Sequence, residues 1–229
     1  EVIDLVAGTR TPVLPGVEMA RYVAGGYLVG ARNQTTLVAA RFDAAAMRVV
    51  GAPVTLWSAG GVRSLEVSPG GVLAMVLEAR DVSGRRLAWI DEQGQVQPIA
   101  GPARAYGDIA ISPDSTRMAG QLEFRGEAEL PAEIWVQDLA RRTVTRLPTE
   151  GVVINSVWSP DGSRIAYGGT TGDHATIWER RSDGSGGAER LFTSTLAQAL
   201  TIPLTWSPDG STLAFVEVDL ATSTDEIRL

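Results

Sequence analysis

The residue best suited to acid–base or nucleophilic chemistry is the only histidine, His174, in the stretch TTGDHATIW. A histidine can act as a general base or bind a metal, and Asp173 beside it could orient an imidazole in a triad. Neighbouring residues of a strand point to opposite faces, however, so any partners would have to converge from elsewhere in the fold. We therefore expect Asp173 and His174 to be contact residues in a loop or at a channel mouth, and no residue is predicted to be catalytic.

Two polar segments could bind an ion or a partner. The glycines of SDGSGG (182–187) lack the lysine and the following helix of a phosphate-binding loop, so a hairpin loop is predicted there. The acidic run FRGEAELPAE (124–133) is predicted to be an enlarged loop that either protrudes as a contact surface or is simply solvated. The candidate interaction residues of this loop are Phe124, Arg125, Glu127, Glu129 and Glu133.

Metal and cofactor sites are not predicted. With one histidine and no cysteine, zinc sites rich in these residues are excluded, as are disulfides and thiol catalysis. Asp114, Asp161 and Asp209 recur along the chain and could suggest calcium, but each lies in its own turn without the D-x-D-x-D spacing of a calcium loop.

These residues belong to a repeat. Ser-Pro recurs at positions 68, 112, 159 and 207, at intervals of 44, 47 and 48 residues (68 to 112, 112 to 159, 159 to 207). Each copy follows a short apolar stretch and precedes an apolar run, and two further apolar segments follow after polar turns. Four short strands in a unit of forty-odd residues are typical of a β-propeller, in which sheets too small to bury both faces stack around an axis.

The predicted fold is therefore all-β: a β-propeller of four-stranded antiparallel blades, with about five blades visible, in a single domain over residues 1–229. Tryptophans 89, 135, 158, 178 and 206 are predicted to sit at equivalent positions of the repeat, which favours packing between blades. The expected repeats are residues 1–16 (partial), 20–59, 65–102, 108–150, 156–195 and 204–229 (partial).

The segment Ser159-Pro160-Asp161-Gly162 is interpreted as the turn that each blade needs at the same place. Proline at the second position presets φ, serine or aspartate caps free backbone N–H groups, and glycine supplies the freedom that closes the hairpin. The serine has no base nearby in sequence, so it is not predicted to be a nucleophile.

The segments WSPDGSRIAY, WSPDGSTLAF and ISPDSTRMAG resemble the WD40-like PD40 repeat of TolB-type propellers. The stretches RYVAGGYLVGAR, GRRLAWIDEQGQ and PARAYGDIAISPD are more narrowly similar to propeller regions of bacterial membrane serine/threonine kinases. The resemblance covers nearly the whole chain and implies a fold whose members mostly bind other proteins, while fold alone does not fix function.

The ends of the chain leave closure of the ring open. Residues 9–14 could complete the blade begun by residues 204–229, giving five blades, but residues 2–5 also resemble a third strand and would duplicate it. This duplication favours a segment of a longer array of six blades or more. The chain begins at Glu1 without a methionine, so we expect a processed or excised piece that could have lost an export signal or anchor.

The leading hypothesis is a non-enzymatic interaction or scaffolding propeller, the accessory or sensory part of a larger bacterial assembly with a protein partner. The net charge of −7 argues against nucleic acid, and no apolar run is long enough to span a membrane, although association with a membrane complex is open. A periplasmic or extracytoplasmic location is expected, with the cytoplasm as the alternative. The alternative functions are a ligand-sensing domain of a membrane kinase and a propeller hydrolase or lyase.

Overall fold

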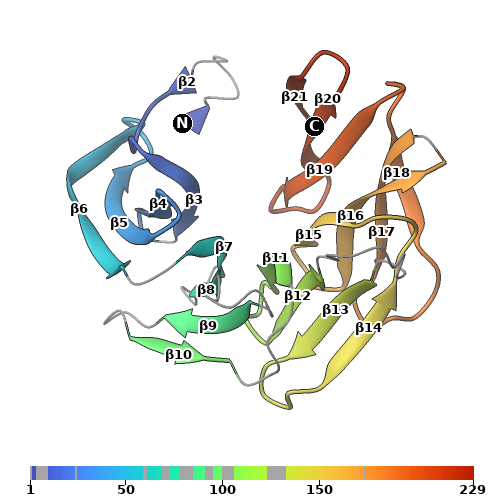
Figure 1. Ribbon diagram of the computed structural model, residues 1–229, viewed down its shortest axis with the longest axis horizontal. Coiled ribbons are helices and arrows are strands. Elements are labelled where there is room, and N and C mark those ends of the chain that lie inside the picture. Colours follow the sequence, from blue (N-terminus) through green and yellow to red (C-terminus); the bar gives the residue numbers. More distant parts are fainter. Residues whose placement is uncertain are drawn as a thin grey trace. The chain divides into compact units, whose positions relative to one another are not determined.

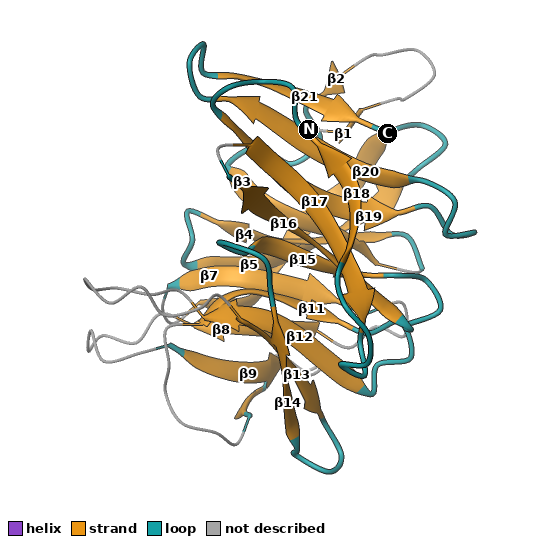
Figure 2. Ribbon diagram, turned by 90° about the vertical axis from the view of Figure 1, so that its right-hand side faces the viewer, coloured by secondary structure: helices purple, strands orange, loops and turns teal. Residues whose placement is uncertain are grey.

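The computed structural model describes residues 2–3, 10–23, 25–58, 61–68, 73–77, 85–90, 95–99, 106–122, 133–172 and 174–229. The regular secondary structure within these ranges consists of β-strands, as Figure 2 shows. The part of the chain so described has no helix able to cross a membrane. The chain folds as two compact units, Glu1–Ala103 and Arg104–Leu229.

The first unit contains a short strand pair and two four-stranded antiparallel sheets in which consecutive strands are hydrogen-bonded (Figure 1). The pair consists of β1 (Val2–Ile3) and β2 (Arg10–Thr11). The strands of the first sheet are β3 (Val17–Val23), β4 (Tyr27–Arg32), β5 (Thr36–Asp43) and β6 (Arg48–Ser58). Those of the second sheet are β7 (Val62–Val67), β8 (Leu73–Leu77), β9 (Arg86–Ile90) and β10 (Val96–Pro98).

The second unit contains three sheets of the same kind, again with consecutive strands paired. The first comprises β11 (Tyr106–Ile111), β12 (Arg117–Leu122), β13 (Glu133–Asp138) and β14 (Val144–Pro148). The second comprises β15 (Ile154–Trp158), β16 (Arg164–Thr171), β17 (His174–Arg181) and β18 (Glu189–Thr193). The third comprises β19 (Ala199–Trp206), β20 (Leu213–Asp219) and β21 (Thr224–Arg228).

These five sheets are the blades of the β-propeller, which confirms the predicted all-β fold class. Four blades have four strands, and the last has three. Along the chain the five blades span residues 17–58, 62–98, 106–148, 154–193 and 199–228.

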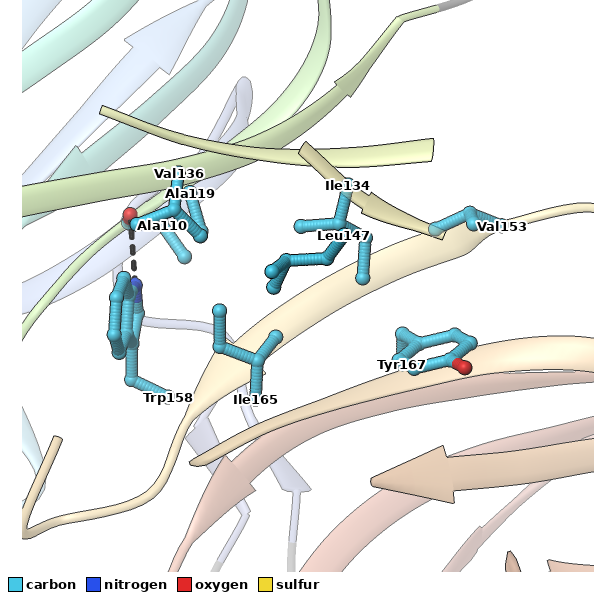
Figure 3. Packing of buried hydrophobic residues seen from close by; sticks show 9 residues of the cluster. All are labelled: Ala110, Ala119, Ile134, Val136, Leu147, Val153, Trp158, Ile165 and Tyr167. Carbon is cyan, nitrogen blue, oxygen red and sulfur yellow. Dashed lines mark hydrogen bonds between the residues drawn. The ribbon is translucent and has the colours of Figure 1, made fainter. Parts of the chain in front are cut away.

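In the second unit the core lies between successive blades, because the inner strands are buried on both faces. Residues of β11–β14 pack against Trp158, Ile165 and Tyr167 of the next blade, as Figure 3 shows. Ile165 and Tyr167 have no exposed surface at all. A sheet of this size cannot cover both of its faces alone, so each blade is stabilised by its neighbour.

The first unit has an equivalent core. Val29, Ala31 and Leu37 of the β3–β6 blade pack with Leu65 and Met75 of the β7–β10 blade. The tryptophans, in contrast, fall into two sets. Trp158 and Trp206 end the first strands of their blades, whereas Trp89, Trp135 and Trp178 lie on third strands.

Candidate functional site

The Ser-Pro-Asp-Gly segments of the second unit are turns whose side chains bond to the turn itself. Between β15 and β16, Ser159 Oγ donates to Asp161 Oδ1 over 2.6 Å and accepts a bond from Arg164 N over 3.0 Å. In the next blade Ser207 Oγ donates to Asp209 Oδ1 over 2.5 Å. The serines therefore hold the hairpins closed, as the sequence predicted, and their hydroxyl groups are engaged.

The same bonds keep the turn carboxylates ionised. The hydrogen bond from Ser159 is the largest of the effects that lower the pKa of Asp161 from 3.8 to about 2. The bond from Ser207 is the largest of those that lower the pKa of Asp209 from 3.8 to about 2, and the pKa of Asp114 is lowered for the same reason. These carboxylates are therefore negative at neutral pH and poor proton donors.

The lowered pKa values predict acid sensitivity. Because the folded pKa lies below the unfolded one, the turn carboxylates contribute stability above about pH 4 that is lost as the pH falls towards 2. We expect the melting temperature to fall between about pH 5 and about pH 2.5, and to fall less in D161N/D209N, whose amide oxygens still accept the serine bonds. Thermal melting followed by circular dichroism measures this. The control D225N alters an exposed carboxylate on β21 and should melt like the unaltered chain. An equal fall of the melting temperature in D161N/D209N and the unaltered chain, or a smaller fall in D225N, would contradict the role of the two turn carboxylates.

Arg117, at the start of β12, ties its blade to the next one. Its guanidinium carbon lies 4.8 Å from the centroid of the Trp158 ring. Its Nη2 donates to the Gly162 carbonyl over 2.8 Å, and its Nη1 donates to Ser182 Oγ over 2.9 Å. Trp158 Nε1 in turn donates to the Ala110 carbonyl over 3.0 Å, the dashed bond in Figure 3. The first two blades of this unit are thereby locked at their turn-bearing ends.

A pocket of about 570 Å³ opens between the β15–β18 and β19–β21 blades, at the same end of the strands. Its lining residues are Ser159, Pro160, Asp161, Ser163, Arg164, Glu179, Trp206, Pro208, Asp209 and Gly210. The lining includes three carboxylates, those of Asp161, Glu179 and Asp209, and one guanidinium, that of Arg164, so the pocket has a surplus of negative charge. The partly buried indole of Trp206 supplies an aromatic surface.

Arg164 is held against its own blade. Its Nη1 lies 2.8 Å from Glu179 Oε2 and 3.4 Å from Glu189 Oε2. The bond to Glu179, which is almost completely buried, raises the pKa of Arg164. The arginine of the pocket is therefore permanently charged and already partnered.

The sequence-predicted candidates lie away from this pocket or outside the described residues. His174 is exposed at the start of β17, five residues from Glu179 and thus about 16 Å along the strand. Asp173 lies outside the described residues, as do Phe124, Arg125, Glu127 and Glu129 of the acidic loop. Glu133 begins β13 and pairs with Arg146 on β14 at 3.7 Å.

The glycine-rich segment is the hairpin loop that the sequence predicts. Ser182 N donates to the Ser163 carbonyl over 2.9 Å, and Asp183 Oδ1 accepts from Ser185 N over 2.9 Å and from Ser185 Oγ over 2.7 Å. The two bonds to Asp183 use its side chain to close the turn, whereas the Ser182 bond is between backbone groups. In the described ranges, no group of three or more acidic, histidine or cysteine side chains is placed to hold a metal ion.

Sequence reasoning missed Arg117, Arg164 and Glu179. The signal for the two arginines was present, because each lies five residues after the serine of a Ser-Pro pair. Glu179 has no comparable signal in the sequence, because its place opposite Ala166 follows from the sheet register. Ala119 pairs with Val136 in one blade, and the equivalent Ala166 pairs with Glu179 in the next.

No protein-family model matches the chain, and no curated protein matches it by sequence. Solved structures match it over most of its length. A protein assigned as TolB from Agrobacterium tumefaciens is 19% identical with a TM-score of 0.70, over 95% of this chain and 81% of that one. TolB from Acinetobacter baumannii is 21% identical with a TM-score of 0.57, over 85% of this chain and 49% of that one.

An oligogalacturonate lyase from Vibrio parahaemolyticus is 11% identical with a TM-score of 0.60, over 88% of this chain and 61% of that one. At these identities the likeness concerns the fold alone. The chain is thus a β-propeller similar in fold to TolB proteins and to a propeller enzyme.

Proposed function

We propose that the chain is a non-enzymatic protein-binding propeller, an accessory or sensory part of a larger bacterial assembly. The binding site in this proposal is the pocket between the β15–β18 and β19–β21 blades. The observation that carries it is the pocket's composition: the lining combines an aromatic face, three carboxylates, two of them with pKa values of about 2, and one arginine that is already paired.

This composition favours binding over catalysis. Asp161 and Asp209 remain ionised at neutral pH and cannot donate a proton there, because their folded pKa values are about 2. The serine hydroxyls of both turns donate to these carboxylates and have no histidine beside them, since His174 lies at the other end of β17. The pocket has what a partner needs to recognise: fixed charge, an aromatic surface and rigid turns.

A second candidate is a ligand-sensing role in a membrane kinase, as the resemblance of the repeats implies. The volume of about 570 Å³ favours it, because it falls within the range of small-molecule sites. The proposal also includes an extracytoplasmic location next to a membrane assembly, which fractionation of the source cells tests.

Position-specific photo-crosslinking separates these functions. A p-benzoylphenylalanine at Pro208, which is exposed and lines the pocket, is expected to crosslink a polypeptide in source cells. The same group at Thr222, exposed on the turn between β20 and β21 at the opposite end of the blade, is expected to give no such product. A polypeptide captured equally at both positions, or only small-molecule adducts at Pro208, would contradict a protein-binding pocket. H174A is expected to leave the Pro208 product unchanged.

A further inference from the structure

Two consecutive blade junctions of the second unit are built from the same parts. Pro113 borders Gly162 at the first junction, where a Cβ on the glycine would lie 3.7 Å from the proline Cδ. Pro160 borders Gly210 at the second, where the same distance would be 3.6 Å. Both glycines have positive φ, 69° and 72°. The two junctions can therefore be compared residue by residue.

At the first junction an arginine occupies the niche, by which we mean the space between the tryptophan and the turn glycine of the following blade. The guanidinium of Arg117 lies over Trp158 at 4.8 Å and donates to the Gly162 carbonyl over 2.8 Å. Gly162 is buried as a result, with Arg117 Nη2 only 3.3 Å from the position of an added Cβ. This junction shows which chemical group fits the niche.

At the second junction the corresponding space is open towards solvent between the described residues of the two blades. Trp206 takes the place of Trp158 and Gly210 that of Gly162, but Gly210 is exposed and the indole is only partly buried. The pocket of about 570 Å³ lies here. No counterpart of Ser182 is among its lining residues, and the carboxylate of Asp209 borders the space with Gly210.

The difference arises from two carboxylates. Arg164 is the repeat equivalent of Arg117, but Glu179 and Glu189 hold it back at 2.8 and 3.4 Å. In the preceding blade, the positions equivalent to these glutamates by strand register are Val136 and Thr145, which offer no carboxylate. Arg117 is therefore free to reach across its junction, whereas Arg164 is retained in its own blade.

We infer that the pocket binds the guanidinium group of an arginine in a partner polypeptide. The flat cation would stack on Trp206 as Arg117 stacks on Trp158, and the ionised carboxylates of Asp161 and Asp209 supply the opposite charge. A lysine ammonium stacks less well because it is a compact, strongly hydrated charge. Free arginine carries an α-ammonium and a carboxylate of opposite charge in place of the two peptide bonds, so it offers the same guanidinium without the backbone of a polypeptide. This inference rests on the proposed protein-binding function and specifies what the pocket recognises.

Titration with short peptides tests the inference. The probes are acetyl-Gly-Arg-Gly-amide, the same peptide with citrulline or lysine in place of arginine, and free L-arginine, followed by the indole N–H signals in NMR spectra. We expect the arginine peptide to bind about tenfold more tightly than the citrulline and lysine peptides and more tightly than the free amino acid. Equal affinity of the arginine and citrulline peptides, or no binding at about 10 mM, would overturn the inference. Tighter binding of free arginine would assign the site to a small ligand and overturn the polypeptide source.

Two variants locate the site. E179V/E189T gives this blade the side chains of the preceding one, so Arg164 should move onto Trp206 and Gly210, and affinity for the arginine peptide should fall at least about tenfold. W206A should lose binding to the same extent. The control E226Q changes an exposed carboxylate on β21 and should bind like the unaltered chain. Thermal melting checks that all variants are folded, and a folded E179V/E189T that binds normally would overturn the inference.

The two proposals can fail separately. If the Pro208 crosslink captures a polypeptide but the arginine peptide does not bind, protein binding survives and arginine recognition is wrong. If the peptide binds but no polypeptide is captured at Pro208, the guanidinium chemistry is right and the protein-binding function is wrong.

Discussion

Replacing Gly168 by alanine is expected to lower the free energy of unfolding by about 3 kcal/mol or more, because the methyl group has no space. Gly168 is buried in β16, and a Cβ there would overlap the carbonyl oxygen of Thr201 on β19 and lie 2.9 Å from the carbonyl oxygen of Ile154 on β15. Both obstacles are backbone atoms, which cannot rotate away as a side chain can. The substitution therefore forces apart two neighbouring blades, or β16 from its own partner strand.

Urea denaturation followed by tryptophan fluorescence measures the effect. The control is G187A, because a Cβ at Gly187 would have no atom within 4 Å, and it should change the free energy of unfolding by less than about 0.5 kcal/mol. Equal stability of G168A and the unaltered chain would show that β16 and β19 are not packed as closely as described. Such a result would also remove the rigid junction that shapes the pocket.

The fold could be predicted from the sequence because its signals are local. Each blade encodes its own turn, as in Ser159-Pro160-Asp161-Gly162, where serine and aspartate close the hairpin through bonds spanning two to five residues. Repetition of the Ser-Pro turn at intervals in the forties marks four of the five blades, and the first blade follows from a degenerate copy of the repeat. The strands on either side follow from short apolar runs.

The pocket could not be predicted because it depends on contacts between residues far apart in the chain. Arg117 and Arg164 hold the same place in their repeats and look equivalent in the sequence. Their different directions follow from the residue paired with the alanine two positions after each arginine. This residue is Val136 in one blade and Glu179 in the other. Only the sheet register connects these positions.

The candidate residues that the sequence predicts stand out by their type. His174 is the only histidine, and the loop of residues 124–133 is rich in acidic residues. The residues that line the pocket are common types at repeated positions, and repetition made Trp206 look like one more core tryptophan. In this repeat fold, the informative residue is the one that breaks the repeat: Glu179 where the preceding blade has valine.

Trp158 and Trp206 provide a direct measurement of how different the two junctions are. W158A is expected to lower the free energy of unfolding by about 3–5 kcal/mol, because it removes a buried indole, its bond to the Ala110 carbonyl and the platform for Arg117. W206A removes the same side chain at the equivalent position, where it is only partly buried and its Nε1 has no hydrogen-bond partner among the described residues. W206A should lower the free energy of unfolding by less than about half as much as W158A does.

The role of Arg117 in that difference is measured with the double variant R117A/W158A. If the arginine stacks on the indole, the two single changes should not be additive, and the coupling should be about 1 kcal/mol. R141A is the matched control, since the Arg141 side chain is 80% exposed and pairs with the nearby Asp138 at 3.1 Å, and it should show no coupling with W158A. Equal losses of unfolding free energy in W158A and W206A would mean that side chains fill the second junction as well as the first. A larger loss in W158A, together with coupling between R117A and W158A, means that Arg117 closes the first junction. The second junction then remains open for an arginine from a partner.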